Sequence, residues 1–196
     1  MSGERISGIL LAGGKSTRMG SEKAFLNFRG KSLFKYPLGI LEKFCSEIIV
    51  STNSKAFQSI VPYRLVGDEI EGKGPLGGLY TCLKQISNYS ALVLGCDMPF
   101  ISEEYIRILI RNSKGHSVCM GANSQGTPEA LAAIYNRSLI PFIDQKIQSG
   151  VYRMNSLLEH KGSLLLDPKL FSFDLDRNFL NINSPDDLKS TGLKDE

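Results

Sequence analysis

The sequence predicts an α/β domain of three layers (α/β/α), in which helices cover both faces of a mostly parallel sheet. Short apolar runs alternate with longer segments of helical periodicity, as in βαβ units. The length of 196 residues fits one domain, residues 1–196, which can bury roughly 70 % of the unfolded chain's surface. The composition, 42 % hydrophobic and 22 % charged, is that of a globular protein rather than a disordered or fibrous one.

The first half of the chain predicts four strands and three helices. The apolar run 6–11 favours a buried strand that ends at Gly13 and Gly14. Further strands are expected at 47–51, 63–66 and 91–95, and helices at 32–44, 76–86 and 102–111. In open α/β sheets, ligands bind at the carboxyl ends of the strands. Gly13, Asn53 and Asp97 follow three of these strands, so we expect the functional site there.

The second half of the chain is less regular. Strands are expected at 117–121, 131–135, 163–166 and 179–182, and helices at 138–148 and 153–160. The run Ser184-Pro185-Asp186-Asp187 is typical of a helix start, with Ser as the N-cap, Pro at the first position and Asp at the third.

Charge and cysteine usage exclude several classes of protein. A net charge of +3 is too small to indicate binding to nucleic acid or to an anionic membrane surface. No apolar run approaches the ~20 residues that a membrane-spanning helix needs. Without a signal-peptide core, we expect a cytoplasmic protein. The four cysteines and two histidines have no zinc-site spacing, so reduced, packed thiols are expected.

The strongest local signal is the segment 11–23, where three glycines, three hydroxyls and three cations follow a buried strand. Glycines let backbone N–H groups approach phosphate oxygens, Arg18 can bind phosphate with its fork, and Lys23 can supply a point charge. The alternative is a surface turn with solvated charges. The segment is not a P-loop, because Ile9 stands where that motif requires glycine.

A literal G-x-G-x-x-G motif occupies Gly72 to Gly77, but residues 67–71 separate it from the preceding predicted strand. We interpret it as a loop near the substrate, and an NAD-dependent oxidoreductase remains an alternative.

Asp97 emerges from a buried strand, where a carboxylate suits Mg²⁺ shared with substrate phosphates. The alternative is an ordinary turn aspartate before Pro99. For Asp68 the alternative is a solvated loop charge, and for Asn53 a turn or helix-cap residue.

Together these motifs resemble the molybdenum cofactor guanylyltransferase family. The resemblance spans nearly the whole chain and is strong over residues 6–101 and 181–188. It rests on Leu11-Ala12-Gly13-Gly14, Arg18-Met19-Gly20, Lys23-Ala24, Gly74-Pro75-Leu76-Gly77-Gly78, Cys96-Asp97-Met98-Pro99-Phe100 and Asn181-Ile182-Asn183-Ser184-Pro185-Asp186-Asp187-Leu188.

The resemblance implies a Rossmann-like nucleotidyltransferase fold, similar to glycosyltransferase A. It implies transfer of GMP from GTP to the terminal phosphate of molybdopterin, with release of pyrophosphate and a need for Mg²⁺. Residues 1–101 would then form the nucleotide-binding half and 102–196 the acceptor-binding half. The L-A-G-G form favours guanine.

The resemblance also implies residue roles. Catalysis would rest on Arg18, facing the pyrophosphate, with Lys23 and Asp97, and Asp97 would hold the metal. Acceptor binding would involve Asn181 and Asn183. GTP binding is implied for Leu11, Ala12, Gly13, Lys23, Asn53, Asp68 and Asp97.

Three positions depart from the family pattern: Glu22 replaces the usual Asp, Gly77 replaces a common Ala, and Glu129 follows Pro128 where an uncharged residue is usual. Two alternatives stay open on the same fold: a cytidylyltransferase or sugar-1-phosphate nucleotidyltransferase, and a non-catalytic GTP-binding cofactor chaperone. Proteins that deliver or receive the cofactor are further candidate partners.

Overall fold

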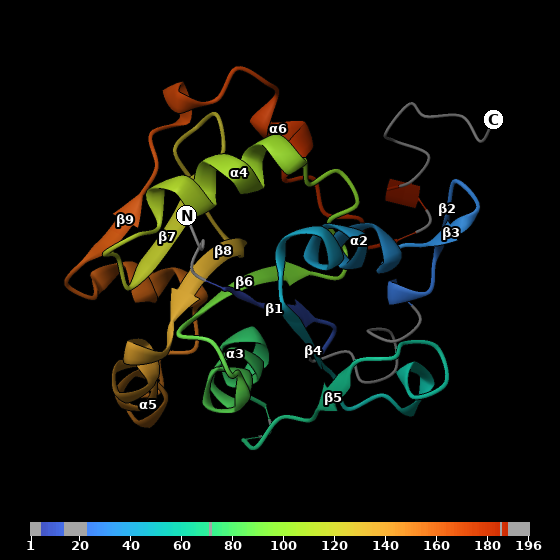
Figure 1. Cartoon of the computed structure of the whole chain (residues 1–196), viewed down its shortest axis with the longest axis horizontal. Helices are drawn as coiled ribbons and strands as arrows, with labels where there is room; N and C mark the ends of the chain where they lie inside the picture. Colours follow the sequence, from blue (N-terminus) through green and yellow to red (C-terminus); the bar gives the residue numbers. More distant parts are fainter. Residues whose placement is uncertain (1–4, 14–22, 71, 185, 188–196) are drawn as a thin grey trace.

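The computed structural model describes residues 5–13, 23–70, 72–184 and 186–187, and a seven-stranded sheet runs through its centre (Figure 1). The strand order is β5-β4-β1-β6-β8-β7-β9, and a separate hairpin pairs β2 with β3. The strands are β1 (Ser7–Leu11), β2 (Asn27–Phe28), β3 (Lys31–Ser32), β4 (Glu47–Ser51), β5 (Arg64–Val66), β6 (Ser90–Gly95), β7 (Val118–Ala122), β8 (Pro128–Asn136) and β9 (Ser163–Leu165).

The sheet is mostly parallel, as predicted. β1 runs parallel to β4 and β6, β4 to β5, and β7 to β9, whereas β8 is antiparallel to both of its neighbours, β6 and β7. The register places Leu11 opposite both Ser51 and Gly95. The carboxyl ends of β4, β1 and β6 are therefore level, and the residues that follow them meet at one edge.

Helices cover both faces of this sheet (Figure 1). The helices are α2 (Lys35–Phe44), α3 (Gly74–Gln85), α4 (Glu103–Asn112), α5 (Ile140–Gln148) and α6 (Leu175–Asn178), with short 3₁₀ turns η1 (Lys55–Phe57), η2 (Arg137–Leu139), η3 (Met154–Glu159) and η4 (Pro168–Leu170). The two faces bury separate cores. Leu10 packs with residues of α2 and α4, and its neighbour Ile9 packs with residues of α3 and α5.

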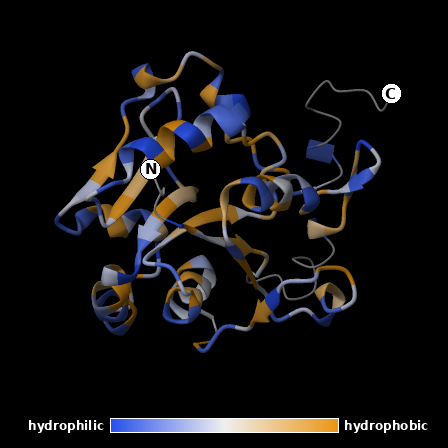
Figure 2. Ribbon diagram, in the orientation of Figure 1, coloured by the Kyte–Doolittle hydropathy of each residue, from blue (hydrophilic) through white to orange (hydrophobic). Residues whose placement is uncertain are grey.

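This alternation follows from the two-residue period of a strand, and it explains why β1 is buried along its whole length. Each buried Ile or Leu side chain of β1 stabilises the fold by roughly 1.5–3 kcal/mol relative to exposure. Figure 2 shows hydrophobic residues concentrated in the central strands, while the outer helices carry hydrophilic residues as well. Within the described ranges, no helix is long and apolar enough to cross a bilayer.

One predicted strand, at 179–182, is wrong. The segment follows α6 as irregular chain, and the N–H of Ile182 donates to the carbonyl of Asp97 at 2.9 Å. The Ile182 side chain is buried with Phe28 and Leu33, which accounts for its apolar character. Ile182 is therefore apolar because it packs against residues of the hairpin region, and not because it belongs to a strand of the sheet.

Other predicted elements are present with shifted bounds or a different type. The helix expected at 32–44 begins at Lys35, because Ser32 belongs to the unpredicted hairpin strand β3. The helix expected at 153–160 is the 3₁₀ turn η3, and the segment expected at 138–148 splits into η2 and α5. The strand expected at 131–135 is part of the longer β8.

Candidate active site

Backbone hydrogen bonds just past the ends of β1, β4 and β6 fix the residues that follow these strands. The N–H of Ala12 donates to the carbonyl of Ser51 at 2.9 Å, and the N–H of Cys96 donates to the carbonyl of Leu11 at 3.0 Å. These bonds continue the parallel ladder one step past β1, β4 and β6. Gly13 follows as an exposed residue at the edge.

Lys23, Asp97 and Asn183 form a cluster at the end of β6. The Lys23 ammonium pairs with the Asp97 carboxylate, with 2.5 Å between Nζ and Oδ2, and also donates to the side-chain oxygen of Asn183. The side chains of Lys23 and Asp97 are only 20 % and 15 % exposed, so their charges are screened less than those of a surface pair. The structure thus joins three residues that are up to 160 positions apart in the chain.

Asn183 is held by the predicted helix start that follows it. The Asp187 carboxylate accepts from the N–H groups of Asn183 at 2.7 Å and Ser184 at 2.9 Å, and the Ser184 hydroxyl accepts from the N–H of Asp187 at 3.2 Å. The bond from Asn183, followed by those from Ser184, lowers the pKa of Asp187 despite the opposing effect of desolvation. Ser184 is therefore the cap that the sequence predicts.

Asn181 offers an unusual polar atom. Its side-chain oxygen is buried and has no hydrogen-bond partner among the described residues. Because buried acceptors are nearly always paired, an unpartnered oxygen beside the end of β6 marks Asn181 as a candidate ligand contact.

Asn53 and Asp68 form a second group, at the ends of β4 and β5. The side-chain oxygen of Asn53 accepts from the N–H of Asp68 at 3.1 Å. A Cβ on Gly78, in α3, would lie 2.6 Å from the Ser51 hydroxyl and 3.3 Å from the Asp68 carboxylate. The glycine at 78 thus lets α3 approach this group closely, which explains one part of the G-P-L-G-G motif.

Leu11 lies between the two groups. Its side chain lies 3.4 Å from the position of that Cβ on Gly78, and its carbonyl accepts from the N–H of Cys96, the residue before Asp97. The structure therefore brings together all the predicted site residues that it describes: Leu11, Ala12, Gly13, Lys23, Asn53, Asp68, Asp97, Asn181 and Asn183. Arg18, like Gly14 and Gly20, lies outside the described residues.

Glycine 95 is a site residue that sequence reasoning missed. A Cβ at this position would lie 2.7 Å from Oδ1 of Asp97, closer than real Cβ contacts. Only glycine leaves room for the Asp97 carboxylate where it stands. The sequence shows a glycine two positions before Asp97, but this spacing by itself does not indicate that the glycine makes room for the carboxylate.

Glu129 lies near the end of β6 as well, on β8. Its carboxylate accepts from the N–H of Leu131 at 2.9 Å. Burial raises the pKa of Glu129, the negative charge of Asp97 raises it further, and the bond from Leu131 only partly opposes this. Glu129 lines a cavity of about 760 Å³ together with Pro75, Pro128, Tyr152, Arg153 and neighbouring residues.

The donor set fits a metal that is shared with a substrate, not a closed protein site. Among the described residues, no group of three or more His, Cys, Asp or Glu side chains could hold a metal ion. Asp97 supplies one carboxylate at an open strand end. That suffices for Mg²⁺, which typically takes one or two carboxylates and completes its shell with water and phosphate oxygens.

The four cysteines are free thiols, as predicted. Burial raises the pKa of each to about 12, and charges nearby have smaller effects on Cys82 and Cys96. Such thiols are poor nucleophiles at neutral pH, which accords with packing roles for these cysteines.

The G-x-G-x-x-G segment does not follow its strand directly. β5 ends at Val66, whereas α3 begins at Gly74, with residues 67–73 between them. This separation disfavours the NAD-dependent alternative, because the dinucleotide fingerprint turns from strand to helix without such an insertion.

Comparisons with known proteins agree with this geometry. The sequence profile of the family described as "MobA-like NTP transferase domain" matches residues 8–164. The molybdenum cofactor guanylyltransferase of Syntrophotalea carbinolica is 32 % identical over 188 residues, which cover 93 % of this chain and 89 % of that protein.

Solved structures show the same architecture. The molybdopterin-guanine dinucleotide biosynthesis protein A of Archaeoglobus fulgidus matches with a TM-score of 0.77 and 26 % identity, covering 94 % of this chain and 96 % of that one. A Mycobacterium tuberculosis protein in complex with manganese shares the fold, with a TM-score of 0.66 and 14 % identity over 95 % of this chain and 97 % of that one. Since the profile spans most of the sheet and includes Lys23, Asn53, Asp68 and Asp97, the chain belongs to the MobA-like NTP transferase domain family and is a nucleotidyltransferase.

Proposed function

We propose that this nucleotidyltransferase transfers GMP from GTP to the terminal phosphate of molybdopterin and releases pyrophosphate. The observation that carries the proposal is the cluster of Lys23, Asp97 and Asn183 at the end of β6, beside the start of the glycine-rich segment. The relative from Syntrophotalea carbinolica, a molybdenum cofactor guanylyltransferase, supports the choice of guanine nucleotide and acceptor.

The chemistry needs charge control rather than a strong base. The acceptor phosphate is already an anion at neutral pH, and it attacks the α-phosphorus of GTP in line while pyrophosphate leaves. Positioning and charge neutralisation are then the main catalytic effects. This accounts for a site whose predicted catalytic residues are two cations and one carboxylate.

We assign the nucleotide to residues 1–101. The strand-end groups of Leu11, Ala12 and Gly13 and the pair of Asn53 and Asp68 would bind GTP. Lys23 would place its charge on the phosphates, with Arg18 on the departing pyrophosphate. Asp97 would hold Mg²⁺, which supplies neutralisation of phosphate charge when it is bound.

We assign the acceptor to residues 102–196. Asn181 would use its unpartnered oxygen, and Asn183 would reach the acceptor from beside Lys23. The cavity lined by Glu129 extends this side of the site. Burial raises the pKa of Glu129 in this cavity. Free thiols at all four cysteines accord with a reducing compartment such as the cytoplasm.

Thermal unfolding with Mg²⁺ and each of GTP, CTP, ATP, UTP and NAD tests the nucleotide. A nucleotide at 100 times its Kd stabilises by about 2.7 kcal/mol, which raises the Tm by roughly 5–10 °C for a chain of this size. We expect a Mg²⁺-dependent shift with GTP. A shift with CTP or UTP instead would replace the guanylyltransferase by the cytidylyl- or sugar-nucleotide alternative.

Pyrophosphate release with molybdopterin as acceptor tests catalysis. Asp97→Asn should abolish turnover and leave the Tm near that of the wild type. The matched control is Asp167→Asn, at an exposed position remote from the site, where asparagine can still cap η4. Normal GTP binding without turnover in the wild type would favour the cofactor-chaperone alternative.

A further inference from the structure

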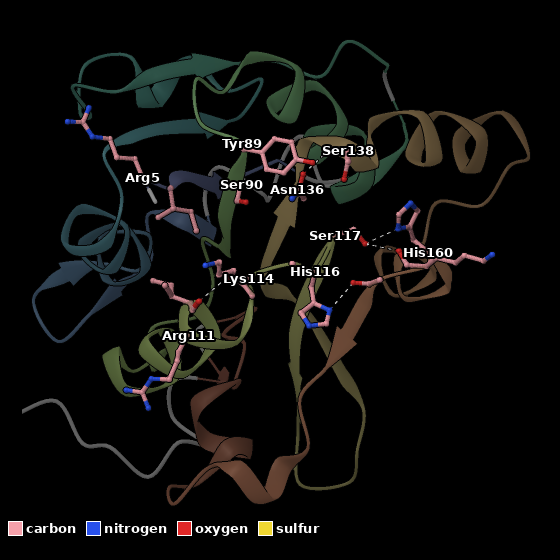
Figure 3. Close-up of a pocket in the computed structure, with 16 residues that line it drawn as sticks. Arg5, Tyr89, Ser90, Arg111, Lys114, His116, Ser117, Asn136, Ser138 and His160 are labelled. Atoms are coloured by element: carbon pink, nitrogen blue, oxygen red, sulfur yellow. Dashed lines mark hydrogen bonds between the residues drawn. The ribbon is translucent and has the colours of Figure 1, made fainter. Parts of the chain in front are cut away.

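A second cavity of about 550 Å³ lies at the edge of the sheet opposite the candidate active site (Figure 3). Its walls come from residues at the amino ends of parallel strands: Arg5 before β1, Ser90 at the start of β6, Ser117 before β7 and Gly162 before β9. The candidate active site lies beyond the carboxyl ends of β1 and β6. The two sites are therefore separated by the length of the central strands.

The lining of this cavity is positively charged. Arg5, Arg111, Lys114 and Lys161 line it with both histidines of the chain, and no Asp or Glu is among its described lining residues. Figure 3 shows Arg5 and Arg111 on one side and the two imidazoles on the other. None of these four cations forms an ion pair with a described residue.

The cations are not required to satisfy the end of α4. The hydroxyl of Ser113 donates to the carbonyl of Ile110 at 2.9 Å, and the Asn112 amide donates to the carbonyl of Ile108 at 2.8 Å. The chain thus satisfies these carbonyls of the last turn with its own neutral groups. Figure 3 shows the guanidinium groups of Arg5 and Arg111 extending outward, so these cations surround the cavity. With no acidic group among the described lining residues, cations around a concave site leave a positive potential that favours an anion.

Two matching turns bring lysines to the rim. Lys114-Gly115 leads into β7 and Lys161-Gly162 leads into β9, and both glycines have positive φ, of 83° and 86°. The turns lie side by side because β7 and β9 are parallel neighbours and the N–H of Ser117 donates to the carbonyl of Gly162 at 3.1 Å.

Hydrogen-bonding groups line the cavity between these cations. Nδ1 of His116 lies 3.1 Å from the carbonyl of Gly162, which can only accept, so Nδ1 donates there. Nδ1 of His160 pairs with the Ser117 hydroxyl at 2.8 Å. Among the described residues, the Nε2 atom of neither ring has a hydrogen-bond partner. Ser90, Asn136 and Ser138 add further polar groups.

We propose that this cavity binds a small phosphorylated molecule. Arg and Lys are the usual partners of phosphate, and the volume lies within the range of about 300–1,000 Å³ found for small-molecule sites. Tyr89, which is 55 % exposed and lines the same cavity, offers an aromatic face to the unphosphorylated part of the ligand.

The two histidines make the proposal directly measurable. The chain has only His116 and His160, and both line this cavity, so the imidazole signals in an NMR spectrum report on it and not on the active site. We would titrate the full chain with inorganic pyrophosphate at fixed pH and fixed ionic strength. A second titration with AMP asks whether a planar ring adds affinity.

We expect saturable shifts of both sets of signals, and at least tenfold weaker pyrophosphate binding when Lys114→Ala and Lys161→Ala are combined. Both lysines are exposed, so the variant should keep the wild-type Tm. The matched control combines Lys55→Ala and Lys169→Ala, two exposed lysines outside the cavity, and should bind as the wild type does.

If AMP binds more tightly than pyrophosphate and Tyr89→Ala removes this difference, the ligand is nucleotide-like. If pyrophosphate binds as tightly as AMP or more tightly, the ligand is a simple phosphate compound. Shifts no larger than those from sodium chloride at the same ionic strength would overturn the proposal. Unchanged affinity in the Lys114 and Lys161 variant would do so as well.

Discussion

Replacing Gly95 by alanine should displace the carboxylate on which catalysis is proposed to depend. The new Cβ would meet Oδ1 of Asp97 at 2.7 Å, while its next neighbours, in Met98 and Leu131, lie at ordinary distances of 3.4 and 3.5 Å. The backbone at Gly95 has no positive φ, so alanine introduces no backbone strain. The substitution therefore acts mainly on Asp97.

The required displacement can be worked out from these contacts. Oδ1 must retreat by about 0.7 Å to reach ordinary van der Waals contact at 3.4 Å from the new Cβ. Oδ2 of the same carboxylate is paired with Lys23 at 2.5 Å, so the movement also disturbs that ion pair. Since a 1 Å misplacement can cost about 10²-fold in rate, we expect kcat to fall on the order of 10- to 100-fold.

Single-turnover release of pyrophosphate, measured beside the Tm and GTP affinity, tests this reasoning. The matched control is Gly39→Ala in α2, where a Cβ meets nothing within 4 Å and alanine should stabilise the helix by about 0.5–1 kcal/mol. A Gly95→Ala enzyme with wild-type kcat would refute the placement of Asp97 at the reacting groups. A large loss of Tm would instead show that the new methyl group disturbs the fold and not only the carboxylate.

Three further substitutions test the folded state. Burial alone would raise the pKa of Glu47, but hydrogen bonds from Ser7, Ser87 and a neighbouring N–H outweigh burial and lower this pKa below its ordinary value. The ionised Glu47 side chain therefore stabilises the fold, and this contribution is lost as the pH falls through the folded-state pKa. Glu47→Gln should then lower the free energy of unfolding at pH 7 and lose less on acidification, and urea melts with parallel pH profiles would contradict this. Burial is the main cause of the raised pKa of Glu129, so the ionised carboxylate destabilises the fold at high pH. Glu129→Gln should therefore raise the Tm at pH 8, and this gain in Tm should vanish below about pH 4. A gain in Tm that does not depend on pH would contradict this cause. Tyr105→Phe leaves a buried carbonyl and a buried N–H without their hydroxyl partner and should cost about 1–3 kcal/mol in urea melts, whereas an unchanged midpoint would show that the hydroxyl contributes nothing.

The fold was largely predictable because the parallel part of the sheet is buried on both sides. Strands such as β1 and β6 are continuous apolar runs, and their periodicity and flanking turns mark them in the sequence. The hairpin of β2 and β3 was missed because each strand has only two residues, too few for any period to appear. The false strand at 179–182 arose because an apolar residue buried by packing resembles one buried in a sheet.

The candidate site was predictable wherever its residues follow strands. Gly13, Asn53 and Asp97 were found because the carboxyl ends of parallel strands meet at one edge. Gly95 and the pairing of Asn183 with Lys23 could not be derived in this way. The role of Gly95 depends on free space beside the Asp97 side chain, which the local sequence pattern does not reveal. The pairing of Asn183 with Lys23 joins residues 160 positions apart, which no local pattern predicts.

The single antiparallel strand of the seven-stranded sheet, β8, brings residues from the second half of the chain to the end of β6. β6 pairs with β1 on one side and with β8 on the other, and Leu94 lies opposite Ala132. Because β8 runs against β6, its first residues, Pro128 and Glu129, lie beside the end of β6 where Asp97 emerges. A parallel β8 would carry them to the opposite edge. The reversal thus brings the cavity lined by Glu129 to the strand end that carries Asp97. Burial is the main cause of the raised pKa of Glu129, and the negative charge of nearby Asp97 adds to it.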